Sequence, residues 1–423
     1  VCGLPLIMST DGGKTFKSID GDNTHGDHHA VWMSDRREKH MIICNDGGLN
    51  ITYDDGAHWF KANTPPVGQF YSVNVDMAKP YNVYGGLQDN GVWTGPSTNT
   101  NSNGWLQEGQ YPYKFIMGGD GMQVEVDTRD NATVYTGFQF GYYYRINKND
   151  SEDGVSIKPE NDLGESNFRF NWQTPICLSR HNQDILYLGS NRFHRSMKKG
   201  EEMKTISADL THNDKTGDVP FNTIVSISES PSRFGLIIVG TDDGFVWLSS
   251  DVGYTWKKIS EGLPQNLYVS RVVASMHKEN RFYVTLNGYR NDHFNPYVYK
   301  TNDGGATWIN ISSDLPDEPV NVVREDPTSE NILYLGTDNG AYCSLNGGES
   351  WMTIGGNLPR VAVHDLVVQP RENELVLGTH GRSIFIASLS EVQKLKDSVV
   401  QKTPVSYKHL TLRTNDQVQI PVV

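Results

Sequence analysis

A short pattern that returns along the whole chain constrains the fold more than any other feature. Five segments combine Ser or Thr with Asp or Asn two residues later, then Gly, and close on Trp or Phe. They are residues 9–16, 52–59, 249–256, 301–308 and 344–351, and a sixth copy at 196–203 has lost the acid and the aromatic. Self-similarity at a period of about 40 to 50 residues indicates a fold built from copies of one supersecondary unit.

Each copy of this pattern, the Asp box, has the chemistry of a tight turn between two antiparallel strands. The Asp side chain can accept backbone N–H bonds across the turn, Gly supplies a positive φ, and the closing aromatic packs between neighbouring sheets. We therefore expect Asp11, Asp54, Asp251 and Asp303, with Asn346 in the last copy, to be structural residues at the outer rim, away from any ligand.

A second repeated feature lies upstream of each box, where an apolar strand ends near Gly and a polar turn leads into another strand. Examples are Val83–Leu87 before the turn 88–91, and Ile332–Gly336 before the turn 337–340. An alternating strand such as Val320–Glu325 comes before each of these units. Four antiparallel strands recurring in this order make one propeller blade. The sequence thus predicts an all-β propeller of about seven to eight blades in this chain, with almost no helix.

The two ends of the chain are compatible with two ways of closing the ring. The last unit, Val363–Leu389, has three strands and no Asp box, and the chain begins with a strand and an Asp box that lack earlier strands. Either the N-terminal hairpin closes the ring with the C-terminal blade, or the chain is part of a larger or tandem propeller with upstream blades missing. We expect the propeller to span residues 1–389, and residues 390–423 to form a short helix at Ser390–Lys396 and an irregular tail.

Composition narrows the possible partners. The formal net charge is -13, and Lys and Arg are scattered, so we expect no nucleic-acid partner. No apolar run is long enough for a membrane span. Four cysteines are too few and too far apart for a disulfide scaffold or a CxxC zinc site, and we expect Cys44, Cys177 and Cys343 to be buried strand residues. We expect no cofactor, and a processed or truncated N-terminus.

Longer phrases around the boxes carry a family resemblance over nearly the whole chain. They include Asp27-His-His-Ala-Val-Trp32, Gly85-Gly-Leu-Gln-Asp-Asn-Gly91, Gly118-Gly-Asp-Gly121, Asn321-Val-Val-Arg-Glu-Asp326, Val363-His-Asp-Leu366 and Gly378-Thr-His-Gly-Arg382. The chain resembles secreted bacterial-neuraminidase-repeat propellers, which are similar in fold to the sortilin lumenal propeller and to xyloglucanase-type tandem propellers. The resemblance implies an extracellular or secreted protein.

One face of the predicted ring is the better place for a ligand. Blade-to-blade connections and the turns between second and third strands emerge together on what we call the connection face, because successive strands alternate in direction. The long connections 109–121, 148–173 and 207–222, and the enlarged turn 287–297, belong to it. Loops on a rigid scaffold commonly carry function. We expect ligand contacts from Tyr111, Tyr113, Asp120, Trp172, Arg271, Tyr289, His364 and Asp365.

Two functions remain open. The first is a secreted binding or assembly module for protein or glycan, in which further blades or subunits can take part. The alternative is a glycoside hydrolase of xyloglucanase or sialidase type, which needs two carboxyl groups. The candidates on the connection face are Asp120, Asp365, Asp89 and Asp46. A sialidase also needs an arginine triad, for which Arg169, Arg271 and Arg382 are the candidates.

A histidine cluster is the densest group of titratable residues. His25, His28 and His29 lie within five positions of one another, but no second cluster stands at a recognised ligand spacing. We therefore expect structural hydrogen bonding rather than metal ligation from these three histidines.

Overall fold

The computed structural model describes residues 1–62, 67–99, 112–214, 221–356 and 358–395, together with β34 (His409–Leu410) and β35 (Thr414–Val418). Over these residues the structure is β, apart from two 3-10 turns, η1 (Tyr289–Asn291) and η2 (Val392–Lys394). Eight sheets have four or five strands each, and a ninth has two. The predicted all-β fold of antiparallel blades is confirmed. None of the described segments forms a helix that is long and apolar enough to cross a membrane.

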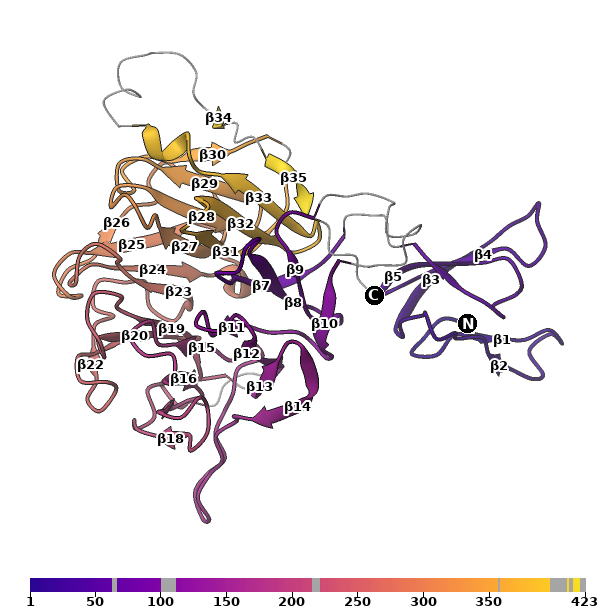
Figure 1. The fold of residues 1–423 in the computed structure, drawn as a ribbon, viewed down its shortest axis with the longest axis horizontal. Coiled ribbons are helices and arrows are strands. Elements are labelled where there is room, and N and C mark those ends of the chain that lie inside the picture. The colour runs from indigo at the N-terminus through magenta and orange to yellow at the C-terminus, as the bar shows by residue number, and fades with distance from the viewer. Residues whose placement is uncertain are drawn as a thin grey trace.

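Seven sheets are arranged around one axis and are named blades 1 to 7 in chain order (Figure 1). Blade 1 comprises β7 (Phe70–Val75), β8 (Asn82–Leu87), β9 (Gly91–Pro96) and β10 (Lys114–Met117). Blade 2 comprises β11 (Glu125–Val126), β12 (Thr133–Phe138), β13 (Tyr142–Asn147) and β14 (Asp150–Ser156). Blade 3 comprises β15 (Ile176–Leu178), β16 (Leu186–Gly189), β17 (Phe193–Ser196) and β18 (Lys204–Thr205). Blade 4 comprises β19 (Ile224–Glu229), β20 (Ile237–Thr241), β21 (Val246–Ser249) and β22 (Lys257–Lys258).

Blades 5 to 7 continue the ring. Blade 5 comprises β23 (Tyr268–Ala274), β24 (Phe282–Asn287), β25 (Tyr297–Thr301) and β26 (Ile309–Asn310). Blade 6 comprises β27 (Val320–Glu325), β28 (Leu333–Thr337), β29 (Gly340–Ser344) and β30 (Met352–Ile354), to which β34 adds in parallel. Blade 7 comprises β31 (Val363–Gln369), β32 (Glu374–Thr379), β33 (Ile384–Ser388) and β35.

The first strands form a separate N-terminal unit outside the ring (Figure 1). It contains the two-stranded sheet β1 (Ile7–Met8) and β2 (Lys17–Ser18), followed by the N-terminal blade, β3 (His28–Met33), β4 (Met41–Asn45), β5 (Gly48–Thr52) and β6 (Phe60–Lys61). The indole nitrogen of Trp59 donates to the backbone oxygen of Ile19 at 2.7 Å, as Trp308 does to Ile259 at 2.8 Å between two ring blades. The β1–β2 sheet thus occupies the place of the outer strands of a neighbouring blade.

The ring closes without the N-terminal hairpin. The closure in which this hairpin pairs with the C-terminal blade, one of the two predicted from the sequence, is therefore wrong. β1 pairs with β2 alone, and the fourth strand of blade 7 is β35. Closure comes from the packing of β31 and β32 of blade 7 against β7 of blade 1. Phe70 and Val73 from blade 1 share one buried cluster with Ile384 and Ile386 from blade 7. Apolar packing between blade faces therefore joins the two ends of the ring.

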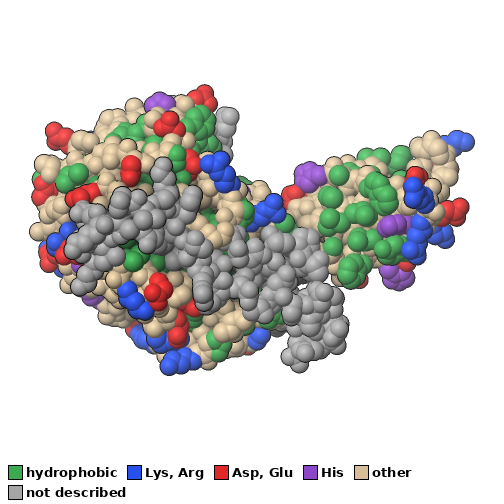
Figure 2. All heavy atoms as spheres, turned by 90° about the horizontal axis from the view of Figure 1, so that it is seen from above, with side chains coloured by type: hydrophobic (Ala, Val, Ile, Leu, Met, Phe, Trp, Pro, Cys, Tyr) green, Lys and Arg blue, Asp and Glu red, His purple; other side chains and the backbone are tan. Residues whose placement is uncertain are grey.

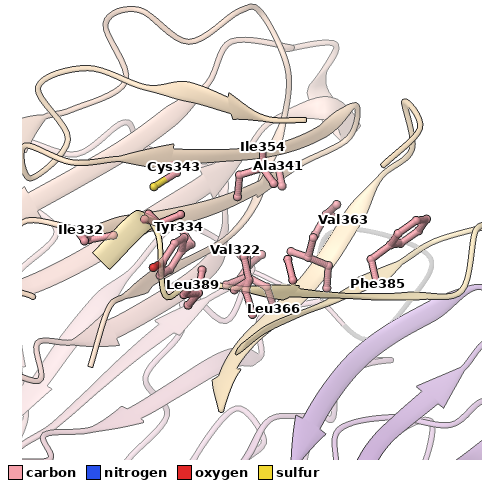
Figure 3. Packing of buried hydrophobic residues seen from close by; sticks show 14 of the residues in the cluster. Val322, Ile332, Tyr334, Ala341, Cys343, Ile354, Val363, Leu366, Phe385 and Leu389 are labelled. Carbon is pink, nitrogen blue, oxygen red and sulfur yellow. The ribbon is translucent and has the colours of Figure 1, made fainter. Parts of the chain in front are cut away.

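Each pair of neighbouring blades buries an apolar layer between their faces. Between blades 6 and 7, Val322 and Tyr334 pack with Leu366 and Phe385, all at most 1% exposed (Figure 3). A tyrosine on the second strand of several blades directs its hydroxyl to a buried carboxylate, as Tyr334 does to Asp326 at 2.7 Å. The hydroxyls of these tyrosines therefore have hydrogen-bond partners within the blade core. The buried hydroxyl of Tyr135 in blade 2 has none among the described residues.

The Asp boxes close turns at the outer ends of the blades. In blade 5, Asp303 Oδ1 accepts the backbone N–H of Thr307 at 2.9 Å, and Asp303 Oδ2 accepts the Thr307 hydroxyl at 2.6 Å. Asp11, Asp54 and Asp251 accept the corresponding backbone N–H at 2.9 Å, and Asn346 accepts it from Ser350 at 3.0 Å. Bonds to the ionised form hold the pKa of Asp303 well below its usual range.

Two local expectations need correction. Cys44 is exposed, since its blade lies outside the ring, and Cys177 is only partly buried, whereas Cys343 is fully buried as predicted. The helix expected at Ser390–Lys396 is reduced to the turn η2, since Leu395 returns to an extended conformation. Apart from β34 and β35, the expected irregular tail lies outside the described residues.

Candidate functional site

The structure separates the eight residues expected to contact a ligand. Asp120, Trp172, Tyr289 and His364 lie on the connection face, in blade connections, at an inner-strand start or in the β24–β25 turn. Arg271 and Asp365 lie further along their inner strands and point into the central channel. Tyr113 is only 3% exposed, because its ring packs over Gly95 in the blade 1 core, and it does not reach the mouth of the channel. Tyr111 lies outside the described residues.

Three carboxylates come together where the N-terminal unit meets blade 1. Asp89, in the β8–β9 turn, donates its backbone N–H to Asp120 Oδ1 at 3.0 Å. The side-chain amide of Asn90 donates to the backbone oxygen of Asp46 at 2.9 Å. Burial first, and then the charges of Asp120 and Asp46, raise the pKa of Asp89. A carboxyl whose pKa is raised beside other carboxyl groups is an arrangement suited to acid–base chemistry.

The three histidines of the N-terminal unit have separate partners. His25 Nε2 lies 3.0 Å from the backbone oxygen of Asp89, and His29 Nε2 lies 2.6 Å from Asp46 Oδ1. His28 is buried and bonds Asp20 at 2.9 Å. Among the described residues no group of three His, Cys, Asp or Glu side chains is placed to hold a metal ion. Two of these histidines therefore support the carboxylate cluster.

Aromatic side chains from blades 1 and 7 and from the connection into blade 3 contact one another on the connection face. The indole nitrogen of Trp172, from the connection into blade 3, lies 3.3 Å from the Tyr71 hydroxyl of blade 1. The Tyr71 ring lies 5.6 Å from that of His380, which stacks on His364 at 4.3 Å, both from blade 7. These contacts join blade 1 to its neighbour, blade 7, and to the connection into blade 3 at this end of the channel.

Burial sets the protonation of this aromatic layer. It lowers the pKa of His364 to about 3, with His380 and Arg271 adding to the shift, and it raises the pKa of Tyr71 to about 12. Both side chains are therefore neutral around pH 7. Exposed rings on the connection face include Trp172 at 37%, Tyr289 at 46% and Phe294 at 53%.

The central channel holds a network of charges from several blades. Asp365 Oδ1 accepts from Arg271 at 3.1 Å and from Arg324 at 3.0 Å, so one carboxylate bridges blades 5, 6 and 7. Asp365 Oδ2 accepts the backbone N–H of Val73 in blade 1 at 3.3 Å. Because both of its carboxylate oxygens are bonded in this way, Asp365 has a structural role in the ion pairs with Arg271 and Arg324. It is not grouped with the carboxylates of the connection face.

A cavity of about 510 Å³ occupies this channel. It is bounded by the inner strands of all seven blades and by residues that follow those strands, namely Met77, Thr128, Pro231, Met276, Pro327 and Pro370. The cavity therefore extends toward the face opposite the connection face. Of the eight predicted contact residues, Arg271 and Asp365 line this cavity.

Five further charged residues line the channel and are not among the predicted site residues, namely Glu125, Arg180, Glu229, Arg324 and Glu325. Arg324 lies within the phrase 321–326, which was noted only for its family resemblance. Their common signal is a charged residue at or just after the end of an inner strand. The arginines expected for a sialidase triad do not assemble, since Arg169 binds Asp209 at 2.8 Å and Arg382 is exposed in the β32–β33 turn.

No family model and no curated protein sequence matches the chain. Among solved structures, the chain is similar to the GH74 xyloglucanase from Xanthomonas campestris, with a TM-score of 0.58 and 16% identity over 78% of this chain and 53% of that one. It is also similar to the GH74 enzyme of Niastella koreensis, with a TM-score of 0.54 and 16% identity over 76% and 52%. The chain spans about half the length of these proteins and matches half of a double propeller. At this identity the likeness establishes the fold alone.

Proposed function

We propose that this chain is a glycoside hydrolase module acting on β-linked polysaccharides, with Asp46, Asp89 and Asp120 as its catalytic group. The observation that carries the proposal is the raised pKa of Asp89 beside two further carboxylates on the connection face. The similarity in fold to xyloglucanases supports xyloglucan as the first substrate to test. Fold alone does not confer an activity, so the argument rests on the carboxylates.

The three carboxylates have different surroundings, and these suit different roles. Asp89 is the general acid, because its raised pKa favours the protonated form that donates to a leaving oxygen. Asp46, which is held by His29 at 2.6 Å and is partly exposed, is the partner carboxylate. Asp120 is a positioning residue, since it is 8% exposed and accepts the backbone N–H of Asp89. A pair of this kind is what glycoside hydrolysis requires.

Exposed aromatic rings on the same face provide a surface for sugars. Trp172 is held by its contact with Phe140 at 5.2 Å between ring centroids, and Tyr289 lies in the enlarged turn of blade 5. Sugar rings stack on such surfaces through their apolar faces. Polysaccharides of this size are encountered outside the cell, so secretion is part of the same proposal.

The direct test is the release of reducing ends from xyloglucan by the wild-type chain and by Asp89→Asn. We expect Asp89→Asn to lower the rate by about 100-fold or more, the size of a general acid contribution. Asp303→Asn, at the outer rim, is the matched control and should leave the rate unchanged. Equal rates for wild type and Asp89→Asn would contradict the assignment of Asp89.

Binding of xyloglucan oligosaccharides separates hydrolysis from recognition. If the wild-type chain binds without cleaving, and Trp172→Ala weakens binding by roughly 1 to 4 kcal/mol, the connection face belongs to a glycan-binding module. If the chain neither binds nor cleaves, the polysaccharide proposal is wrong in both forms.

A further inference from the structure

We propose that the channel cavity is a binding site for a small carboxylate-bearing molecule, held by Arg180, Arg271 and Arg324. These arginines come from blades 3, 5 and 6, and all three line the same cavity. The site lies beyond the aromatic layer of Tyr71, His364 and His380, away from the carboxylate cluster of the connection face. It is therefore independent of the proposed hydrolase site.

The guanidinium groups of the three arginines have few partners. Arg180 is exposed to the cavity and makes no hydrogen bond or ion pair with any residue that the structure describes. Arg271 uses one terminal nitrogen on Asp365, and its Nε has no partner within the described ranges. Arg324 binds Asp365 and its neighbour's backbone oxygen. Most of their N–H groups therefore remain free to donate.

The arginines repel one another in the absence of an added anion. Burial, followed by the positive charges of Arg271 and Arg180, lowers the pKa of Arg324 to about 10. Like charges that are held close together destabilise a fold unless a ligand or partner of opposite charge compensates for their repulsion. Asp365 compensates for part of it, but one carboxylate serves two arginines.

The other acids around the cavity leave a surplus of positive charge near the axis. Glu229 and Glu325 turn toward the blade interfaces, where they accept from the hydroxyls of Tyr187 and Tyr283, both at 2.9 Å. Burial raises the pKa of Glu125 to about 7, so this side chain is partly neutral near pH 7. Among the described residues, Asp365 is thus the one carboxylate that pairs with these three arginines, and it serves two of them.

The chemistry and size of the cavity favour a carboxylate of monosaccharide size. A planar carboxylate already lies between two of the arginines in the form of Asp365, which shows that their geometry accepts this group. A cavity of about 510 Å³ is larger than a simple inorganic ion needs and is within the range of small-molecule sites. D-glucuronate, with one carboxylate on a sugar ring, is therefore the probe of choice.

The test is calorimetric titration of the full chain with D-glucuronate, with D-glucose and sodium sulfate as comparison ligands. We expect saturable binding of glucuronate only, weakening as salt is added. Arg180→Gln should raise the dissociation constant at least tenfold, whereas Arg233→Gln, at a surface arginine paired with Glu279, should leave it unchanged. Circular dichroism confirms that each variant is folded.

A rise in wild-type melting temperature with glucuronate concentration gives a second measurement that needs no variant. Absence of both the heat of binding and this thermal shift would overturn the proposal. Equal binding by Arg180→Gln would overturn the placement of the site, and binding of sulfate as tight as that of glucuronate would overturn the carboxylate assignment. Each of these results is independent of hydrolysis at the connection face.

Discussion

The ring blades and the N-terminal blade have the same strand pattern but very different burial. In blade 6 the inner strand β27 buries Val322 and Val323 completely. In the N-terminal blade the corresponding strand β3 leaves Val31 44%, Trp32 49% and Met33 65% exposed. Figure 2 shows hydrophobic side chains gathered on the surface of the N-terminal unit.

The difference shows which properties of a blade follow from its own sequence and which depend on the neighbouring blades. The Asp box and the strand alternation form a four-stranded sheet in both places. Burial of both faces of a blade requires a blade on either side. Each ring blade has two such neighbours, whereas the strong contacts of β3 with other described strands are with β4 of its own sheet. A blade therefore forms from its own sequence, while most of its stability comes from the packing of adjacent blades.

The largest expected effect compares the same substitution in the two regions. Phe70→Ala removes a fully buried ring from the seam between blades 1 and 7, and should lower the free energy of unfolding by about 3 to 5 kcal/mol. Phe60→Ala in β6, where the ring is 54% exposed, should cost about 1 kcal/mol or less. Urea denaturation followed by circular dichroism measures both, and similar losses would contradict the comparison.

A smaller effect concerns acid stability, which the Asp boxes should give to both regions. Hydrogen bonds lower the pKa of Asp54, in the N-terminal unit, to about 2. Since the folded value lies below the unfolded value, its contribution is present above about pH 4 and is lost as the pH falls toward 2.

Replacement by Asn tests this titration. Asn346 already fills the same position in blade 6 and accepts the same backbone bond. Asp54→Asn should therefore leave the fold intact and reduce the fall in melting temperature of the N-terminal unit between pH 4 and pH 2. An unchanged acid profile would show that the aspartate does not stabilise this turn, and Asp303→Asn is the corresponding variant in the ring.

The repeat units and their strands could be predicted because turn chemistry and alternation are local properties. The closure could not, since the contact of Phe70 with Ile384 and the hydrogen bond from Val73 to Asp365 join residues that are far apart in the sequence. Tyr113 was placed at a ligand face from its position in a long connection, but Gly95 opposite it leaves room for the ring in the core. Arg180 and Arg324 were missed because strand position alone does not reveal which side chains converge on the axis.

The central claim is that blades 1 to 7 form a closed ring to which the N-terminal unit adds no closing strand among the described residues. The direct measurement is thermal unfolding, followed by circular dichroism, of a chain that lacks residues 1–62. The account predicts a single cooperative transition with a melting temperature close to that of the ring in the full chain. Loss of cooperative unfolding, or aggregation of the shortened chain, would show that the N-terminal unit is needed to close the ring.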